Sequence, residues 1–152
     1  IKTVVDIVVV ALASPLHVGV YEDGHLVEHI QSTEHTSEAL PLLFEALANH
    51  YTFQRLFFAR GPGSFMSIKI SYIFLKTLSI ALNIPLYASN GFTFNEGRPI
   101  KALRKLYFVQ EEGIIKTRTY EEPQEQSFDL PQVLDTTCFS EETEPLYMLP
   151  AV

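Results

Sequence analysis

The stretch Leu56-Phe57-Phe58-Ala59-Arg60-Gly61-Pro62-Gly63-Ser64-Phe65 decides how the middle of this chain is interpreted. Its apolar first half predicts a buried strand, and a helical pattern follows over residues 67–82. Gly61 and Gly63 allow a tight turn, and Ser64 is a good N-terminal cap for the helix. A strand, a glycine-rich turn and a helix together aim backbone N–H groups at an anion. We therefore interpret Gly61-Pro62-Gly63-Ser64-Phe65 as a candidate phosphate- or nucleotide-binding loop.

The alternative for this loop is an ordinary turn that binds nothing, because many strand-to-helix turns need glycine and a cap. No Walker lysine follows at the P-loop spacing. Met66 stands where a Gly-x-Gly-x-x-Gly motif needs its last glycine. The pattern around Ser64 is not Gly-x-Ser-x-Gly either, which excludes the nucleophile elbow of a hydrolase.

Regular elements are predicted on both sides of the loop. Apolar or alternating patterns predict strands over residues 3–13, 17–21, 25–31, 55–59 and 83–88. Helices are predicted over residues 37–49 and 67–82; Pro41 predicts that the first begins late or is kinked. Three consecutive strands, then helix, strand, helix and strand, are the order of the ribonuclease-H-like α/β core shared by actin, Hsp70 and sugar kinases.

The pattern weakens after residue 95. Residues 106–109 and 114–120 predict a hairpin, and the rest is rich in Glu, Gln and Pro with few apolar anchors. We therefore predict two domains. Residues 1–95 form the ribonuclease-H-like lobe that carries the loop, and residues 96–152 form a reduced, acidic second lobe.

Composition and charge limit the partners of this protein. The chain has 152 residues and a net charge of −7; residues 111–152 hold two Lys or Arg against ten Asp or Glu. An acidic protein lacks the cations that grip a phosphate backbone, so no strong direct binding of tRNA or other nucleic acid is expected. We find no uninterrupted apolar run long enough to span a membrane, and we predict no membrane association. The single cysteine, Cys138, predicts a cytoplasmic protein.

Both predicted helices are more apolar than one sheet requires. A helix on a sheet needs an apolar stripe of about 100°, and residues 68–83 leave only a narrow polar arc. This excess predicts either that the helices cover each other or that they form a protein interface. The candidate interface residues are Leu40, Leu43, Phe44, Leu47, Ser71, Phe74, Leu75, Leu78 and Leu82.

The sequence contains no persuasive catalytic or metal-binding set. His25 and His29 share a strand face, but no further ligand completes a metal site. Asp6 lies inside an apolar strand without companion carboxylates, and Cys138 has no histidine beside it in the sequence. We therefore predict no catalytic residue and no metal.

Four motifs in order resemble the bacterial TsaB (YeaZ) family over about residues 20–95. They are His35-Thr36-Ser37-Glu38-Ala39-Leu40-Pro41, the Gly61 to Phe65 loop, Lys76, and Asn83-Ile84-Pro85-Leu86. The resemblance implies an actin/Hsp70-like fold without its own catalytic site, related to proteins labelled glycoprotease-like. It implies pairing with a TsaD-like subunit through helices 37–49 and 67–82. With a TsaE-like ATPase, such a pair adds a threonylcarbamoyl group to an adenosine beside the tRNA anticodon.

The resemblance also implies no cofactor of this protein's own, with ATP or ADP at the interface of the complex as an alternative. The chain departs from the family at Leu12-Ala13-Ser14, where the family has Asp-Thr-Ser, and at Met66-Ser67, where it favours Thr-Gly. Tyr72, Ile73 and Phe74 replace small residues in the second helix. Two other hypotheses stay open: a small nucleotide-binding enzyme of the kinase-like superfamily, and a homodimeric scaffold.

Overall fold

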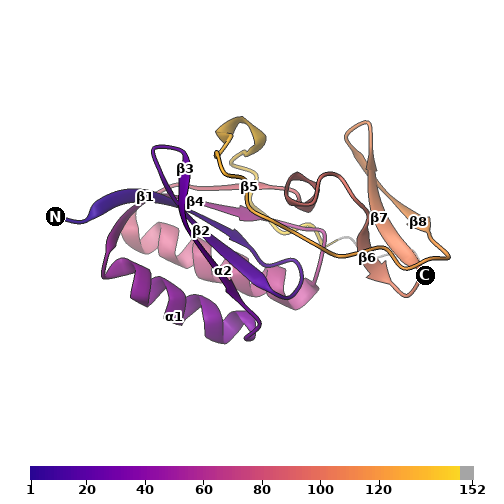
Figure 1. The fold of residues 1–152 in the computed structure, drawn as a ribbon, viewed down its shortest axis with the longest axis horizontal. Coiled ribbons are helices and arrows are strands. Elements are labelled where there is room, and N and C mark those ends of the chain that lie inside the picture. The colour runs from indigo at the N-terminus through magenta and orange to yellow at the C-terminus, as the bar shows by residue number, and fades with distance from the viewer. Residues whose placement is uncertain (148–152) are drawn as a thin grey trace.

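The computed structural model describes residues 1–147 (Figure 1). The chain contains a larger and a smaller β-sheet, two α-helices and two short 3-10 helices. The larger sheet is built from β1 (Thr3–Val10), β2 (Leu16–Glu22), β3 (His25–Ser32), β4 (Tyr51–Ala59) and β5 (Leu86–Ser89). The helices are α1 (Thr36–Ala48) and α2 (Phe65–Leu82), and the 3-10 helices are η1 (Gly91–Phe94) and η2 (Thr136–Cys138). The smaller sheet contains β6 (Ile100–Leu103), β7 (Leu106–Glu111) and β8 (Ile114–Thr119).

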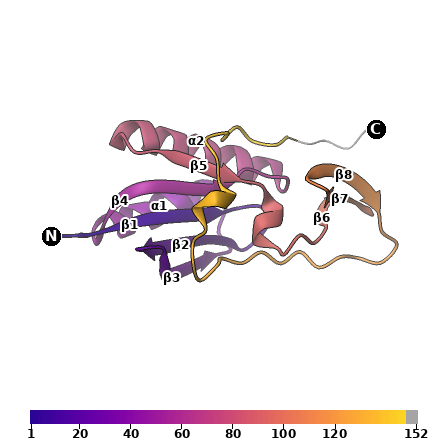
Figure 2. The same cartoon turned by 90° about the horizontal axis from the view of Figure 1, so that it is seen from above.

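The five-stranded sheet has the order β3-β2-β1-β4-β5. Strands β1, β2 and β3 are antiparallel, whereas β4 is parallel to β1 and β5 is parallel to β4. Each of the two parallel connections runs through one helix and moves one strand in the same direction. Right-handed crossovers therefore place α1 and α2 on the same face of the sheet, as Figure 2 shows.

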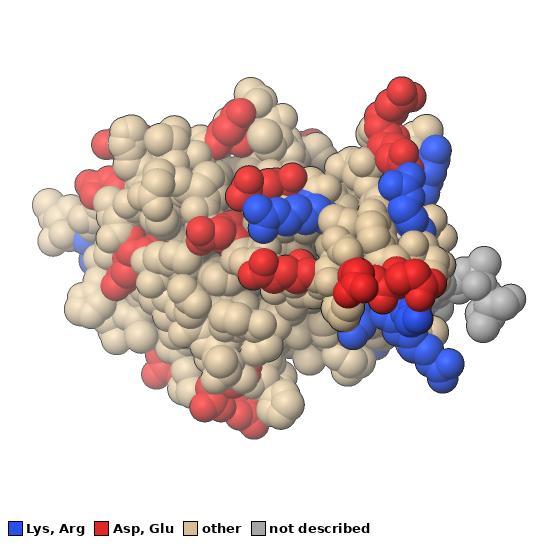
Figure 3. Space-filling view, turned by 45° about the vertical axis from the view of Figure 1, so that its right-hand side comes forward, with Lys and Arg blue, Asp and Glu red and all other residues tan. Residues whose placement is uncertain are grey.

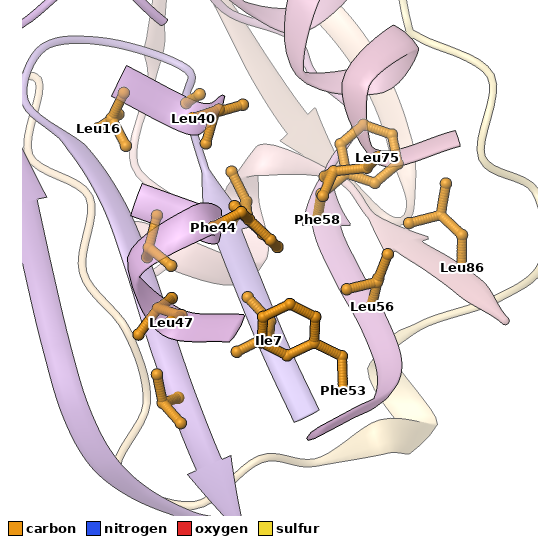
Figure 4. Packing of buried hydrophobic residues seen from close by; sticks show 14 of the residues in the cluster. Ile7, Leu16, Leu40, Phe44, Leu47, Phe53, Leu56, Phe58, Leu75 and Leu86 are labelled. Atoms are coloured by element: carbon orange, nitrogen blue, oxygen red, sulfur yellow. The ribbon is translucent and has the colours of Figure 1, made fainter. Parts of the chain in front are cut away.

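The core between the sheet and the helices is apolar. Alternate residues of β1, including Ile7, point toward the helices and meet Leu40, Phe44 and Leu75 (Figure 4). Phe44 makes edge-on ring contacts with Phe53 and Phe74, at centroid distances of 5.6 Å and 5.1 Å. This packing joins α1, α2 and β4 into one layer.

A second core covers the opposite face of the sheet. Val8 and Val10 of β1 pack with Phe108 of the small sheet and with Phe128 and Leu130 of the C-terminal segment. The C-terminal segment, residues 120–147, has little regular secondary structure and crosses the outside of this core (Figure 2). Residues on both sides of position 95 thus share one core, and the division into two lobes stays a prediction.

The predicted order of elements is observed, with three differences in detail. Strand β1 ends at Val10 although the apolar run continues to residue 13, because the chain turns there toward β2. Strand β6 was missed because four residues give too short a pattern. Helix α1 begins at Thr36 and contains Pro41, so the late start predicted for this helix is wrong. Pro41 lies near the N-terminal end, where a missing N–H removes only one hydrogen bond.

Helix α2 is the one helix in residues 1–147 that is long and apolar enough to cross a membrane by length and composition. Its 18 residues have a mean hydropathy of 1.5. The sequence analysis did not single it out because Lys69 and Lys76 interrupt the apolar run. In the structure, Ile68 and Leu75 of this helix are buried in the cores of the chain.

A buried histidine pair joins β2 to β3 on the side of the C-terminal segment. His17 Nδ1 lies 2.9 Å from His29 Nε2, and His17 is only 6% exposed. Burial and the neighbouring His29 lower the pKa of His17 below its ordinary value of 6.5, and Asp129 opposes this shift. His17 is therefore neutral in the folded protein at neutral pH.

The lowered pKa of His17 predicts that the protein loses stability in mild acid. Below pH 6.5 the unfolded chain binds a proton at this position before the folded chain does. The free energy of unfolding should fall as the pH drops through 6.5, and level off below the folded pKa. Urea unfolding at several pH values measures this slope. His17→Leu should flatten it, and an unchanged slope in that variant would contradict the assignment.

Candidate partner-binding site

Helices α1 and α2 pack side by side and leave two shallow grooves on their outer face. One groove, of about 430 Å³, runs between the N-terminal half of α1 and the middle of α2. The other, of about 530 Å³, lies between the C-terminal parts of the helices and the start of β4. Pro41, Phe74 and Leu78 line both grooves, so they form the boundary between them.

The surface of the grooves is apolar and almost free of charge. Glu45 is the only described residue lining either groove that carries a formal charge. Several large apolar side chains of α1 and α2 are exposed around the grooves: Leu42 is 69% exposed, Ile73 52%, Ile80 71% and Leu82 48%. An exposed apolar surface of this kind is typical of a protein interface.

The structure separates the predicted interface residues into two groups. Five lie buried inside this chain, where they stabilise the fold: Leu40, Phe44, Leu47, Ser71 and Leu75. Ser71 donates its hydroxyl to the Ile68 carbonyl within α2, at 3.1 Å. The other four, Leu43, Phe74, Leu78 and Leu82, are only partly buried or exposed. Ile70, Ile73 and Pro41 also line the grooves, and the sequence analysis did not select them.

The Gly61 to Phe65 loop connects β4 to α2, as predicted, and its glycines lie against this chain. A Cβ added at Gly63 would lie 2.8 Å from the Leu12 carbonyl oxygen, which also accepts a 2.8 Å hydrogen bond from the Ser64 N–H. Gly61 has a φ of +119°, and a Cβ there would lie 3.0 Å from the Leu146 carbonyl oxygen. The packing of the chain therefore accounts for both glycines. Phosphate binding at this loop stays a prediction.

Ser64 is the N-cap residue of α2, but its side chain makes no capping hydrogen bond. At the end of the loop, the ring of Phe65 contacts that of Tyr147, with centroids 4.7 Å apart. A cavity of about 260 Å³ lies beside Ser64 and Ser67, and Thr36 and Ser14 line its other walls. This polar cavity is the place near the loop where a small anion would fit.

The close contact at Gly63 predicts a sensitive position. Gly63→Ala should lower the free energy of unfolding by about 1–3 kcal/mol, because the new methyl group must push the Leu12 backbone away. Ser64→Ala removes no observed side-chain bond and should change stability by less than about 0.5 kcal/mol. Urea unfolding followed by circular dichroism measures both. Equal stability of Gly63→Ala and the wild type would contradict the close approach.

The candidate catalytic residues have structural surroundings. Asp6 is buried in β1 and receives two hydrogen bonds from Arg55 of β4, at 2.9 Å and 2.7 Å. Cys138 is exposed, and partial desolvation together with Asp135 raises the pKa of its thiol, which disfavours the reactive thiolate. Among residues 1–147, no group of three or more His, Cys, Asp or Glu side chains has a geometry that could hold a metal ion.

Together, the sheet order and the two helices on one face define the class of the protein. It is an α/β protein with the ribonuclease-H-like fold of the actin, Hsp70 and sugar-kinase superfamily, reduced in size. The fold class predicted from the sequence is confirmed.

Comparison with known proteins agrees with this class. The family model of TsaD, tRNA N6-adenosine threonylcarbamoyltransferase, matches residues 22–93. YeaZ from Pseudomonas aeruginosa is similar in structure, with a TM-score of 0.59 and 16% identity. A crystal structure of an uncharacterized protein with similarity to peptidase YEAZ from Pseudomonas aeruginosa has a TM-score of 0.54, also at 16% identity. Each match covers 78% of this chain and 65% of the other. No curated protein is significantly similar to the chain in sequence.

The predicted resemblance to the bacterial TsaB (YeaZ) family is confirmed by these matches. The structural match establishes the fold, and the family-model match connects residues 22–93 with the protein families of tRNA threonylcarbamoyladenosine biosynthesis. The chain spans about 65% of the length of the solved structures that it matches.

Proposed function

We propose that this protein is a non-catalytic partner subunit of the cytoplasmic machinery that adds a threonylcarbamoyl group to an adenosine beside the tRNA anticodon. In this proposal, the grooves on α1 and α2 bind a TsaD-like catalytic subunit, and a TsaE-like ATPase joins the pair. The single observation that carries the proposal is the nearly uncharged, apolar outer face of two helices in a chain with a net charge of −7. A chain this acidic has many charged residues for its surface, so a large uncharged area indicates a protein partner.

A role without catalysis agrees with the chemistry of the site. The one carboxylate inside the larger sheet, Asp6, is paired with Arg55 and has no free oxygen directed at a cavity. The cavity beside the Gly61 to Phe65 loop is lined by hydroxyl groups and His35, without a carboxylate pair that could hold a metal–nucleotide complex. We propose that any ATP or ADP is held at the interface of the complex.

Co-expression with the TsaD homologue of the same organism tests this proposal directly. The mass of the co-purified material, measured by light scattering, should correspond to a defined complex of the two chains. This chain alone should not transfer threonylcarbamoyl groups, and the complex should do so when the other components are added. Two separately eluting proteins would contradict the proposal.

Self-association through the same helices is the second candidate function, because an apolar face can meet its own copy across a two-fold axis. Sedimentation of this chain alone would then show a dimer that persists when the TsaD-like protein is added. If the dimer is instead replaced by the mixed complex, self-pairing reflects only the absence of the partner.

A nucleotide-binding enzyme remains the third candidate function, and the polar cavity beside Ser64 is the observation that favours it. Calorimetric titration of the isolated chain with Mg-ATP separates it from the other two. Gly63→Val is a poor variant for this purpose, because the close contact with Leu12 predicts that it disturbs the fold.

A further inference from the structure

Strand β8 is an uncovered sheet edge within residues 1–147. It pairs with β7 on one side only, in the three-stranded order β6-β7-β8. The C-terminal segment supplies hydrogen bonds to every other edge. Gln132 and Leu134 bond to the chain at β3, Ser140 pairs with Ala88 of β5, and the Gln126 side chain bonds to β6. Because natural proteins usually protect such edges, the free edge of β8 is a candidate interaction surface.

The register of the β7–β8 hairpin identifies the groups on the free edge. Glu111 pairs with Ile114 across the two-residue turn formed by Glu112 and Gly113, whose φ values are 51° and 79°. The closing pair of such a hairpin exchanges hydrogen bonds, and the pattern then alternates along the strand. The N–H and C=O groups of Ile115, Thr117 and Thr119 therefore point away from β7. These groups can form hydrogen bonds with another extended strand.

The charges on β8 select among strands. Lys116 and Arg118 are exposed and share one face of the strand, on either side of Thr117. Residues 98–118 hold six Lys or Arg against two Glu, a net charge of +4, whereas the rest of the chain holds five against sixteen, a net charge of −11. Figure 3 shows the Lys and Arg side chains gathered at the end of the molecule that carries the small sheet. A second copy of β8 would bring its own Lys116 and Arg118 beside them, and like charges opposite each other are unfavourable.

Nucleic acid is a poorer match than a peptide for this surface. Three of the six cations are paired with carboxylates: Arg98 with Glu96 at 4.0 Å, Lys105 with Glu121 at 2.8 Å and Arg118 with Glu111 at 2.8 Å. These pairs leave few cations for phosphates to neutralise. A peptide backbone, by contrast, can satisfy the alternating N–H and C=O groups of the edge.

We propose that β8 binds an extended acidic peptide of a partner protein, which adds a fourth strand to the small sheet. Carboxylates at alternate positions of the peptide lie beside Lys116 and Arg118, and its backbone bonds to Ile115, Thr117 and Thr119. This surface is separate from the outer face of α1 and α2, so the proposal does not depend on the function proposed above.

A short, end-blocked peptide that alternates Glu with Val is a direct probe. In amide NMR spectra of the ¹⁵N-labelled protein, it should shift the signals of Ile115, Thr117 and Thr119 and slow their hydrogen exchange. Thr117→Pro removes one outward N–H without breaking the β7 ladder, and should weaken binding about tenfold. Thr117→Val keeps that N–H and should bind like the wild type.

Charge reversal gives a second readout that does not depend on proline. Lys116→Glu with Arg118→Glu should weaken binding of the Glu peptide at least about tenfold, since two cross-strand pairs become repulsive. The same variant should bind a peptide that alternates Lys with Val. No binding of the Glu peptide to the wild type at millimolar concentration would overturn the proposal. Equal binding of both peptides, or binding of oligouridylate in place of the peptide, would overturn it as well.

Discussion

Ile73→Asp is expected to weaken the complex with the TsaD-like subunit about thirtyfold or more. Ile73 is 52% exposed and lines the groove between α1 and α2, so in the complex an aspartate there would be buried without a partner. Loss of one central apolar contact in an interface removes about 2 kcal/mol, and an unpaired charge adds to this loss. Calorimetric titration of the purified TsaD-like protein into each variant measures the affinity.

Ile80→Asp is the matched control for this prediction. Ile80 lies two turns further along α2, is 71% exposed, and lines neither groove. Its replacement should change the affinity less than about threefold, which corresponds to less than 1 kcal/mol. Leu43 and Leu78 are less suitable positions, because both pack against the core and an aspartate there would also destabilise the fold. Equal affinities of the two variants would contradict the placement of the interface in the groove.

Arg55→Met is expected to lower the free energy of unfolding by about 3 kcal/mol. Its guanidinium group holds the Asp6 carboxylate, whose side chain is only 3% exposed, and removal leaves a buried charge without a partner. Methionine keeps much of the aliphatic packing, so the loss reports mainly on the ion pair. Urea unfolding at neutral pH measures the effect.

Two comparisons separate the buried pair from ordinary surface charges. Arg118→Met breaks an exposed pair with Glu111 and should change stability by less than about 1 kcal/mol. The double variant Asp6→Leu with Arg55→Met removes both charges, and should recover most of the loss of Arg55→Met. A change of less than about 1 kcal/mol for Arg55→Met alone would contradict the importance of this pair.

Periodicity predicted the elements well because strands and helices that bury one face repeat their apolar residues at fixed spacing. The runs around Val8 and Phe57 and the stripe of α1 are of this kind. Strand β6 and the path of the C-terminal segment were not predictable in this way. That segment is held by single anchors such as Phe128 and Leu134, together with backbone hydrogen bonds to strand edges. A sequence pattern does not encode such isolated contacts.

The candidate site was predicted in part. The excess of apolar residues on both helices indicated a surface beyond the sheet, and both grooves lie on these helices. The individual residues were harder to choose, because a helix that is apolar on nearly every side gives no sign of which side faces its own sheet. Leu40 and Leu75 therefore belong to the core, whereas Ile73 is exposed.

The sequence by itself determined the class of fold, the turn between β4 and α2, and the presence of two helices too apolar for one sheet, because all three follow from local patterns. Only the tertiary structure decided which helix side stays exposed, that Asp6 meets Arg55 across 49 positions, and that Gly63 lies against Leu12. Each of these depends on the path by which distant residues come together, and neighbouring residues in the sequence carry no record of that path.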